Sequence, residues 1–146
     1  MYGNIMVAMN DSESSQRVLD EALRMGDAAK TTIRLLFVAD GRALSSYPVA
    51  YRETTRRQAQ ELLDAAQLRV RQAGLKCEIR LEETLSTVDS VVDCLLRHAA
   101  SMPADLAVMG THGRGGWMRL AKGSVAESFA RRSTCPVLLT RLSTRP

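Results

Sequence analysis

Residues 106–127 read LAVMGTHGRGGWMRLAKGSVAE, and this stretch decides the fold. It begins with a short apolar run at 106–109, which is typical of a strand buried in a parallel sheet. A glycine-rich segment follows, and Gly123-Ser124 then opens an amphipathic helix that carries Val125 and Phe129. A buried strand that passes through a glycine-rich turn into a helix is the repeating unit of an α/β protein.

Four further apolar runs predict strands at 5–9, 33–38, 77–81 and 137–140, and the third of these alternates as a less buried strand would. Between the runs, apolar residues recur at helical spacing. We therefore predict an α/β fold of the Rossmann-like, adenine nucleotide alpha hydrolase-like type. It has three layers, with an open, parallel, five-stranded sheet covered by helices on both faces, in one domain over 1–146. The helical stripes are Val18, Leu19, Ala22, Leu23; Ala59, Leu62, Leu63, Ala66, Val70; and Val88, Val91, Val92, Leu95, Leu96, Ala99.

Capping residues mark the ends of these helices. Asp11 or Ser12 is expected to cap the first helix, and Ser86 or Thr87 the third, with Asp89 and Ser90 in its first turn. Gly74 is expected to end the second helix. Residues 41–51 lack clear periodicity and contain a proline, so we expect a surface loop there.

The composition narrows the class of protein. No apolar run approaches the roughly 20 residues that span a bilayer, and the N-terminus lacks a secretory signal pattern, so we expect a cytoplasmic protein without a membrane partner. The net charge of +4 comes from scattered arginines, which favours a solvated surface over nucleic-acid binding. Three cysteines without a CxxC pair indicate free thiols and argue against a metal site, with Cys94 expected in the core. His98 is expected on a helix surface or in the C-terminal turn of a helix.

The carboxyl ends of the strands are where an open α/β sheet binds its ligands. Gly110 and Gly113 allow the backbone to approach a ligand, and the free amides at the start of the Gly123-Ser124 helix can hold a phosphate. The alternative is that the glycines only make turns and Ser124 only caps its own helix. Neither a Walker A loop nor a dinucleotide fingerprint is present, and the residues alone leave both readings open.

The spacing Gly110-x-x-Gly113, nine residues, then Gly123-Ser124 resembles the G-2x-G-9x-G-[S/T] signature of the ATP-binding branch of the universal stress protein family. Two longer segments also look like that family: the sequence around the signature, VMGTHGRGGWMRLAKGSVAESFARRSTCPVLLTR, and the segment near the start of the chain, IMVAMNDSESSQRVLDEAL. The resemblance covers nearly the whole chain, and only the 41–75 region is indistinct.

The resemblance implies a site for ATP, with a Mg²⁺ ion bridging the phosphate oxygens. Strands one, two and four would border the nucleoside, and the glycine-rich segment would hold the triphosphate. The chain has Asn10 where the family commonly has an aspartate, which would weaken a hydrogen bond by about 1 kcal/mol without removing the site. The implied binding residues are Ala8, Met9 and Asn10; Val38; Met109 and Gly110; and Gly113, Arg114, Gly123, Ser124 and Val125.

The leading functional hypothesis is an ATP-binding, nucleotide-responsive module of the cytosolic stress response. The resemblance also implies a homodimer formed through the last strand, which we expect at an edge of the sheet. A slow ATPase is one alternative, although no residue is evidently placed as an acid or base, and His112 has no partner at catalytic spacing. A dimeric interaction protein that does not bind nucleotides is the other.

Overall fold

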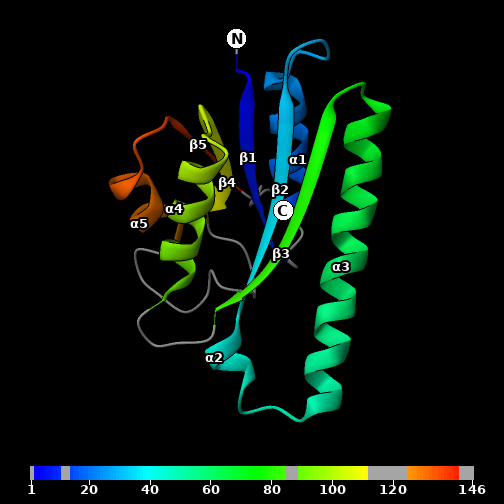
Figure 1. The fold of residues 1–146 in the computed structure, drawn as a ribbon, viewed down its shortest axis with the longest axis vertical. Helices are drawn as coiled ribbons and strands as arrows, with labels where there is room; N and C mark the ends of the chain where they lie inside the picture. The colour runs from blue at the N-terminus through cyan, green and yellow to red at the C-terminus, as the bar shows by residue number, and fades with distance from the viewer. Residues whose placement is uncertain (1, 11–13, 85–88, 112–124, 142–146) are drawn as a thin grey trace, which may run out of the picture.

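The computed structural model describes residues 2–10, 14–84, 89–111 and 125–141. All strand pairs within these residues are parallel, and the five strands lie in the order β3-β2-β1-β4-β5 (Figure 1). The predicted fold class is confirmed. The strands are β1 (Asn4–Met9), β2 (Thr32–Asp40), β3 (Lys76–Thr84), β4 (Leu106–Thr111) and β5 (Val137–Arg141).

Two helical layers cover the sheet, and the alternation of side chains along each strand divides the core between them. Ile5, Val7 and Met9 of β1 pack toward α1 (Ser14–Met25) and α3 (Val49–Gln72). Met6 and Ala8 pack on the other face, toward α4 (Val91–Ser101) and α5 (Val125–Arg132). Figure 1 shows α3 along one side of the sheet, and α4 and α5 on the other. Each pair of consecutive strands is thus joined through at least one helix, as parallel strands require.

Helix α4 begins later than the capping residues predicted. Ser90 is its N-cap: the Ser90 hydroxyl accepts from the Asp93 amide, and the Asp93 carboxylate accepts from the Ser90 amide. This capping box satisfies two donors that the first turn leaves open. The placement of Asp89 and Ser90 inside the first turn was therefore wrong. Ser86, Thr87 and Val88, like the caps Asp11 and Ser12 proposed for α1, lie outside the described residues.

The expected loop at 41–51 was also wrong in part. A short helix, α2 (Gly41–Leu44), follows β2 directly, and α3 starts at Val49 after an N-cap at Pro48. Proline suits this position because its missing N–H and restricted φ fit the start of a helix. The other end of α3 agrees with the sequence: Gly74, with φ of +85°, follows the C-cap Ala73.

The two edges of the sheet differ in character. Along β3, exposed side chains alternate with half-buried ones over the first part of the strand. This pattern fits the less buried strand that was predicted. β5 lies at the opposite edge, as expected, and its Leu139 is 40% exposed. In the part of the chain that the structure covers, none of the helices has the length and apolar character needed to cross a membrane.

Candidate functional site

The carboxyl ends of β1, β2 and β4 meet at one edge of the sheet. β1 pairs with β2 on one side, up to Met9 opposite Phe37, and with β4 on the other. The order of the strands reverses at this point, because β2 and β3 extend the sheet one way from β1 and β4 the other. Such a switch point is where open α/β sheets bind ligands.

Three of the residues implied for the nucleoside are apolar, are at most 3% exposed and belong to one core cluster. Ala8, Val38 and Met109 come from the three strands, and all belong to the core on the α4/α5 side. Val125, the first described residue of α5, packs against the same core. We call Ala8, Val38 and Met109 the shelf. Met9 lies at the same strand end, but its side chain points to the opposite face, toward α1 and α3.

Asn10 is held in place directly after β1. The Asn10 amide N–H donates to Ser15 Oγ at 2.8 Å, and Ser15 Oγ lies 2.7 Å from the Asn10 carbonyl oxygen and 3.1 Å from Asn10 Oδ1. Asn10 and Ser15 are both buried, at 5% and 2% exposed. The Ser15 hydroxyl thus satisfies buried polar groups of the chain where it leaves the sheet. The sequence did not single out Ser15, because Asp11 and Ser12 were the expected caps of this helix.

Gly110 has a packing role that the sequence did not reveal. A Cβ atom at Gly110 would lie 3.3 Å from Ser14 Oγ and 3.3 Å from Val18 Cγ2. Both neighbours belong to α1, so the open side of this glycine faces α1 and not the shelf. A small residue is therefore needed here for close contact between a helix and a strand. Gly113, Arg114, Gly123 and Ser124, the remaining residues of the implied phosphate site, lie outside the described residues.

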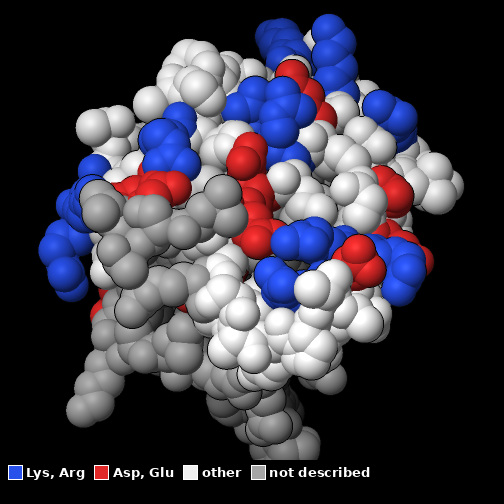
Figure 2. Space-filling view, turned by 60° about the horizontal axis from the view of Figure 1, so that its bottom comes forward, with Lys and Arg blue, Asp and Glu red and all other residues white. Residues whose placement is uncertain are grey.

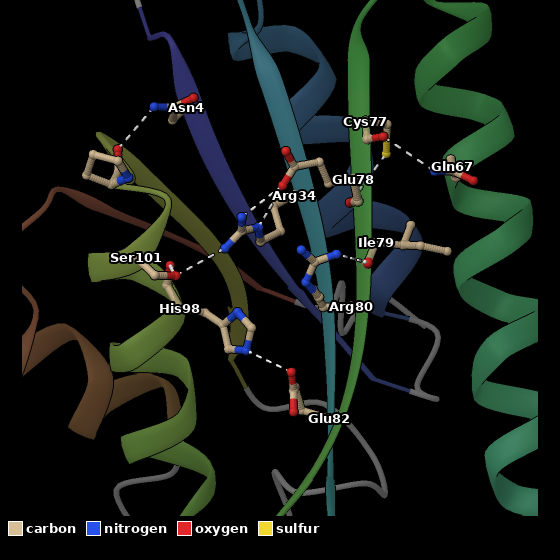
Figure 3. A network of polar contacts seen from close by, with 11 residues as sticks. Asn4, Arg34, Gln67, Cys77, Glu78, Ile79, Arg80, Glu82, His98 and Ser101 are labelled. Atoms are coloured by element: carbon tan, nitrogen blue, oxygen red, sulfur yellow. Dashed lines mark hydrogen bonds and ion pairs between the residues drawn. The ribbon is translucent and has the colours of Figure 1, made fainter.

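A polar network joins α4 to the edge strand β3 on the shelf side of the sheet (Figure 3). His98 Nε2 lies 3.2 Å from Glu82 Oε2, and Arg34 on β2 donates to both Glu78 and Ser101. His98 lies in the last turn of α4, which was one of its two expected places, and its side chain is only 14% exposed, which excludes the other. Burial lowers the pKa of His98, and the neighbouring Glu82 carboxylate opposes that shift.

The cysteines and acidic residues supply little reactivity in the described part of the chain. Cys77, Cys94 and Cys135 are free thiols, and Cys94 is buried in the core as predicted. Burial raises the pKa of both Cys77 and Cys94 to about 11, so both thiols stay protonated at neutral pH. Among the described residues, no three His, Cys, Asp or Glu side chains are grouped to hold a metal ion.

The model of the universal stress protein family matches residues 1–141. A putative universal stress protein of Staphylococcus aureus, strain USA300, is 31% identical over 149 aligned positions, which cover 99% of this chain and 87% of the relative.

Solved structures agree on the architecture. The hypothetical protein MJ0577, whose structure served to assign its biochemical function, superimposes with a TM-score of 0.83 at 19% identity, covering 99% of both chains. A universal stress protein in complex with cAMP superimposes with a TM-score of 0.71 at 25% identity, and the match covers 97% of this chain and 99% of the other. A family member from Arabidopsis thaliana with AMP bound superimposes with a TM-score of 0.69 at 18% identity, and the match covers 97% of this chain and 92% of the other. With its family model, relative and fold all in agreement, the chain belongs to the universal stress protein family.

Proposed function

We propose that this protein binds an adenine nucleotide over the shelf, and that it acts as a nucleotide-responsive module of the cytoplasmic stress response. The observation that carries the proposal is the convergence of Ala8, Val38 and Met109 at the switch point of the sheet. An apolar surface at that point suits the face of a purine ring, since a flat apolar group gains from burial there. Two family members of the same fold have cAMP and AMP bound.

In this proposal the ribose lies beside Asn10 and the main chain of Met9 and Gly110. The hydrogen bonds between Asn10 and Ser15 fix the backbone at Asn10, so that the end of β1 is ordered before a ligand arrives. A preorganised backbone loses less entropy when it binds a ligand. Met9 would act through its main chain only, because its side chain packs on the far face.

The phosphates would be held by Gly113, Arg114, Gly123, Ser124 and the first turn of α5 at Val125. Free amides and the positive end of the helix dipole favour an anion at such a helix start. We propose ATP with Mg²⁺ as the ligand. The divalent ion would bridge phosphate oxygens, as it commonly does at nucleotide sites.

We further propose that two copies of the chain pair through β5. This edge strand carries Leu139, which is 40% exposed, next to the half-buried Val137 and Leu138. An apolar edge strand left in water is a site for association with another strand. Sedimentation should give a dimer for the wild type and a monomer for Leu139→Lys, whereas Leu68→Lys on the exposed face of α3 should stay dimeric. A monomeric wild type would refute the pairing.

A melting scan with nucleotides tests the binding function. ATP with Mg²⁺ at a hundred times its dissociation constant should raise the Tm by about 5 °C or more, because the ligand binds only the folded state. Gly113→Val should abolish that rise. Gly3→Val is the matched control, since a Cβ at Gly3 meets only Asp105 Oδ2 at 3.6 Å, at the opposite end of the sheet.

The result that refutes the proposal is a wild-type Tm that stays constant with ATP, AMP and cAMP alike. An equal rise in the wild type and in Gly113→Val would show that nucleotide binds elsewhere than at the glycine-rich segment.

A further inference from the structure

A pocket of about 200 Å³ lies on the face of the sheet opposite the shelf. Its floor is formed by Phe37 and Ala39 of β2 with Leu81 of β3, and its roof by Ala59 on α3. Leu44 of the short helix α2 closes one end. Phe37, Ala39 and Ala59 are core residues of the α1/α3 side, whereas Val38, between the two floor residues, belongs to the shelf.

The pocket exists because two small residues face each other across the layer. Phe37 pairs with Leu81 and Ala39 with Glu83, so these side chains share one face of the sheet. Farther along α3, Leu63 is fully buried and fills the layer, but one turn earlier the position is Ala59. Ala39 beneath Ala59 leaves the gap. The pocket is partly open to solvent, and its apolar floor offers a small ligand a surface on which it can be buried.

The rim of the pocket is charged, but its charges satisfy one another. Arg56 Nε donates to Glu83 Oε1 at 2.8 Å and Arg56 Nη2 to Glu83 Oε2 at 3.2 Å. Glu82 also borders the pocket, but its carboxylate turns to the other face, toward His98. Figure 2, in which the lower end of the molecule in Figure 1 comes forward, shows acidic and basic side chains side by side on this surface.

We propose that this pocket binds a small uncharged aromatic molecule. Most of the lining is apolar, and Thr55 adds one hydroxyl group beside the charged rim. A charged ligand would either lose its hydration without a partner or break the paired Arg56 and Glu83. The same reasoning excludes a nucleotide, whose phosphates need donors. The Phe37 ring on the floor can contact a second ring edge-to-face. An apolar cavity of about 150 Å³ holds benzene, so this pocket has room for a ring with small substituents.

The test uses two probes that share a methyl-substituted ring, of which one is uncharged and the other is an anion. p-Cresol is uncharged at pH 7, because a phenol has a pKa near 10, whereas 4-methylbenzoate keeps the ring and methyl group but carries a carboxylate. At ten times its dissociation constant, p-cresol should raise the Tm of the wild type by about 3 °C, and 4-methylbenzoate should leave it unchanged. In the NMR spectrum, p-cresol should move the amide signals of Leu44 and Ala59 and spare that of Leu95 on the far face.

Ala59→Leu should fill the pocket and abolish both responses to p-cresol. Ala65→Leu, on the exposed face of the same helix, is the control and should respond like the wild type. If Ala59→Leu does not fold, the NMR map of the wild type decides the question alone. The proposal is overturned if p-cresol moves no signals near Leu44 and Ala59, if 4-methylbenzoate binds equally well, or if Ala59→Leu still responds.

Discussion

The two faces of β2 near its carboxyl end make a contrast. Val38 points to the α4/α5 side and belongs to the same core cluster as Ala8 and Met109, whereas Phe37 and Ala39 point to the α1/α3 side and line a pocket. The backbone is the same, and only the alternation of side chains separates the two surfaces. Under the two proposals, one strand end serves two ligands of different chemistry, because each face has its own covering helices.

The largest expected difference is between two glycines near the carboxyl end of the sheet, Gly41 and Gly110. A Cβ at Gly41, where α2 begins, would lie 2.1 Å from the carbonyl oxygen of Thr84, and the backbone would have to move. A Cβ at Gly110 would meet α1 at 3.3 Å, which a small shift relieves. We expect Gly41→Ala to lower the free energy of unfolding by about 3 kcal/mol, and Gly110→Ala to change it by less than about 1 kcal/mol. Urea denaturation of both variants measures this, and the reverse order would contradict the account.

The second contrast lies within α3, between two alanines of the same buried stripe. Ala66 is 3% exposed in the filled part of the layer, and Ala59 is 4% exposed over the pocket. Ala66→Leu should cost about 2 kcal/mol because the added atoms overpack the core. Ala59→Leu should raise the stability by about 1 kcal/mol, since it fills a void. Equal losses in the two variants, measured by thermal unfolding, would mean that the pocket has no room for a side chain.

The smallest effect is the pH dependence from His98, on the shelf side. Because burial lowers the pKa of His98 below its usual value of 6.5, the unfolded chain takes up a proton at a higher pH than the folded chain does. The stability that the neutral His98 side chain contributes is thus complete above pH 6.5 and is lost as the pH falls through the pKa of His98 in the folded chain. Glu82, Arg34 and Arg80 are the charged groups that act on the ring. The free energy of unfolding of His98→Gln should fall less steeply below pH 6.5 than that of the wild type, and parallel curves would argue against this.

Much of the sheet could be predicted, because buried parallel strands leave short apolar runs in the sequence. The start of α3 could not be predicted in the same way. Its first residues, such as Val49 and Tyr51, are at least half exposed, so they carry no apolar stripe to signal a helix. The late start of α4 at Ser90 depends on a capping box, and earlier serine and threonine residues offered equally plausible caps.

The candidate site also has features that the sequence predicts and features that it does not. The resemblance implied that the ends of strands one, two and four border one site, and these strands are neighbours in the sheet. The register that sets Ala8, Val38 and Met109 on one face could not be predicted from the sequence. The contact of His98 with Glu82, and the gap between Ala39 and Ala59, join separate elements, so no local pattern encodes them. Gly110 was expected to let the backbone approach a ligand, but the atoms nearest to the open side of Gly110 belong to α1.

The most direct measurement follows two alanine methyl groups by NMR as ATP with Mg²⁺ is added. Ala8 and Ala39 lie on opposite faces of the sheet near the same edge. The ring current of an adenine over the shelf should move the Ala8 signal and leave the Ala39 signal in place. If neither signal moves, or if only Ala39 responds, the nucleotide does not occupy the shelf.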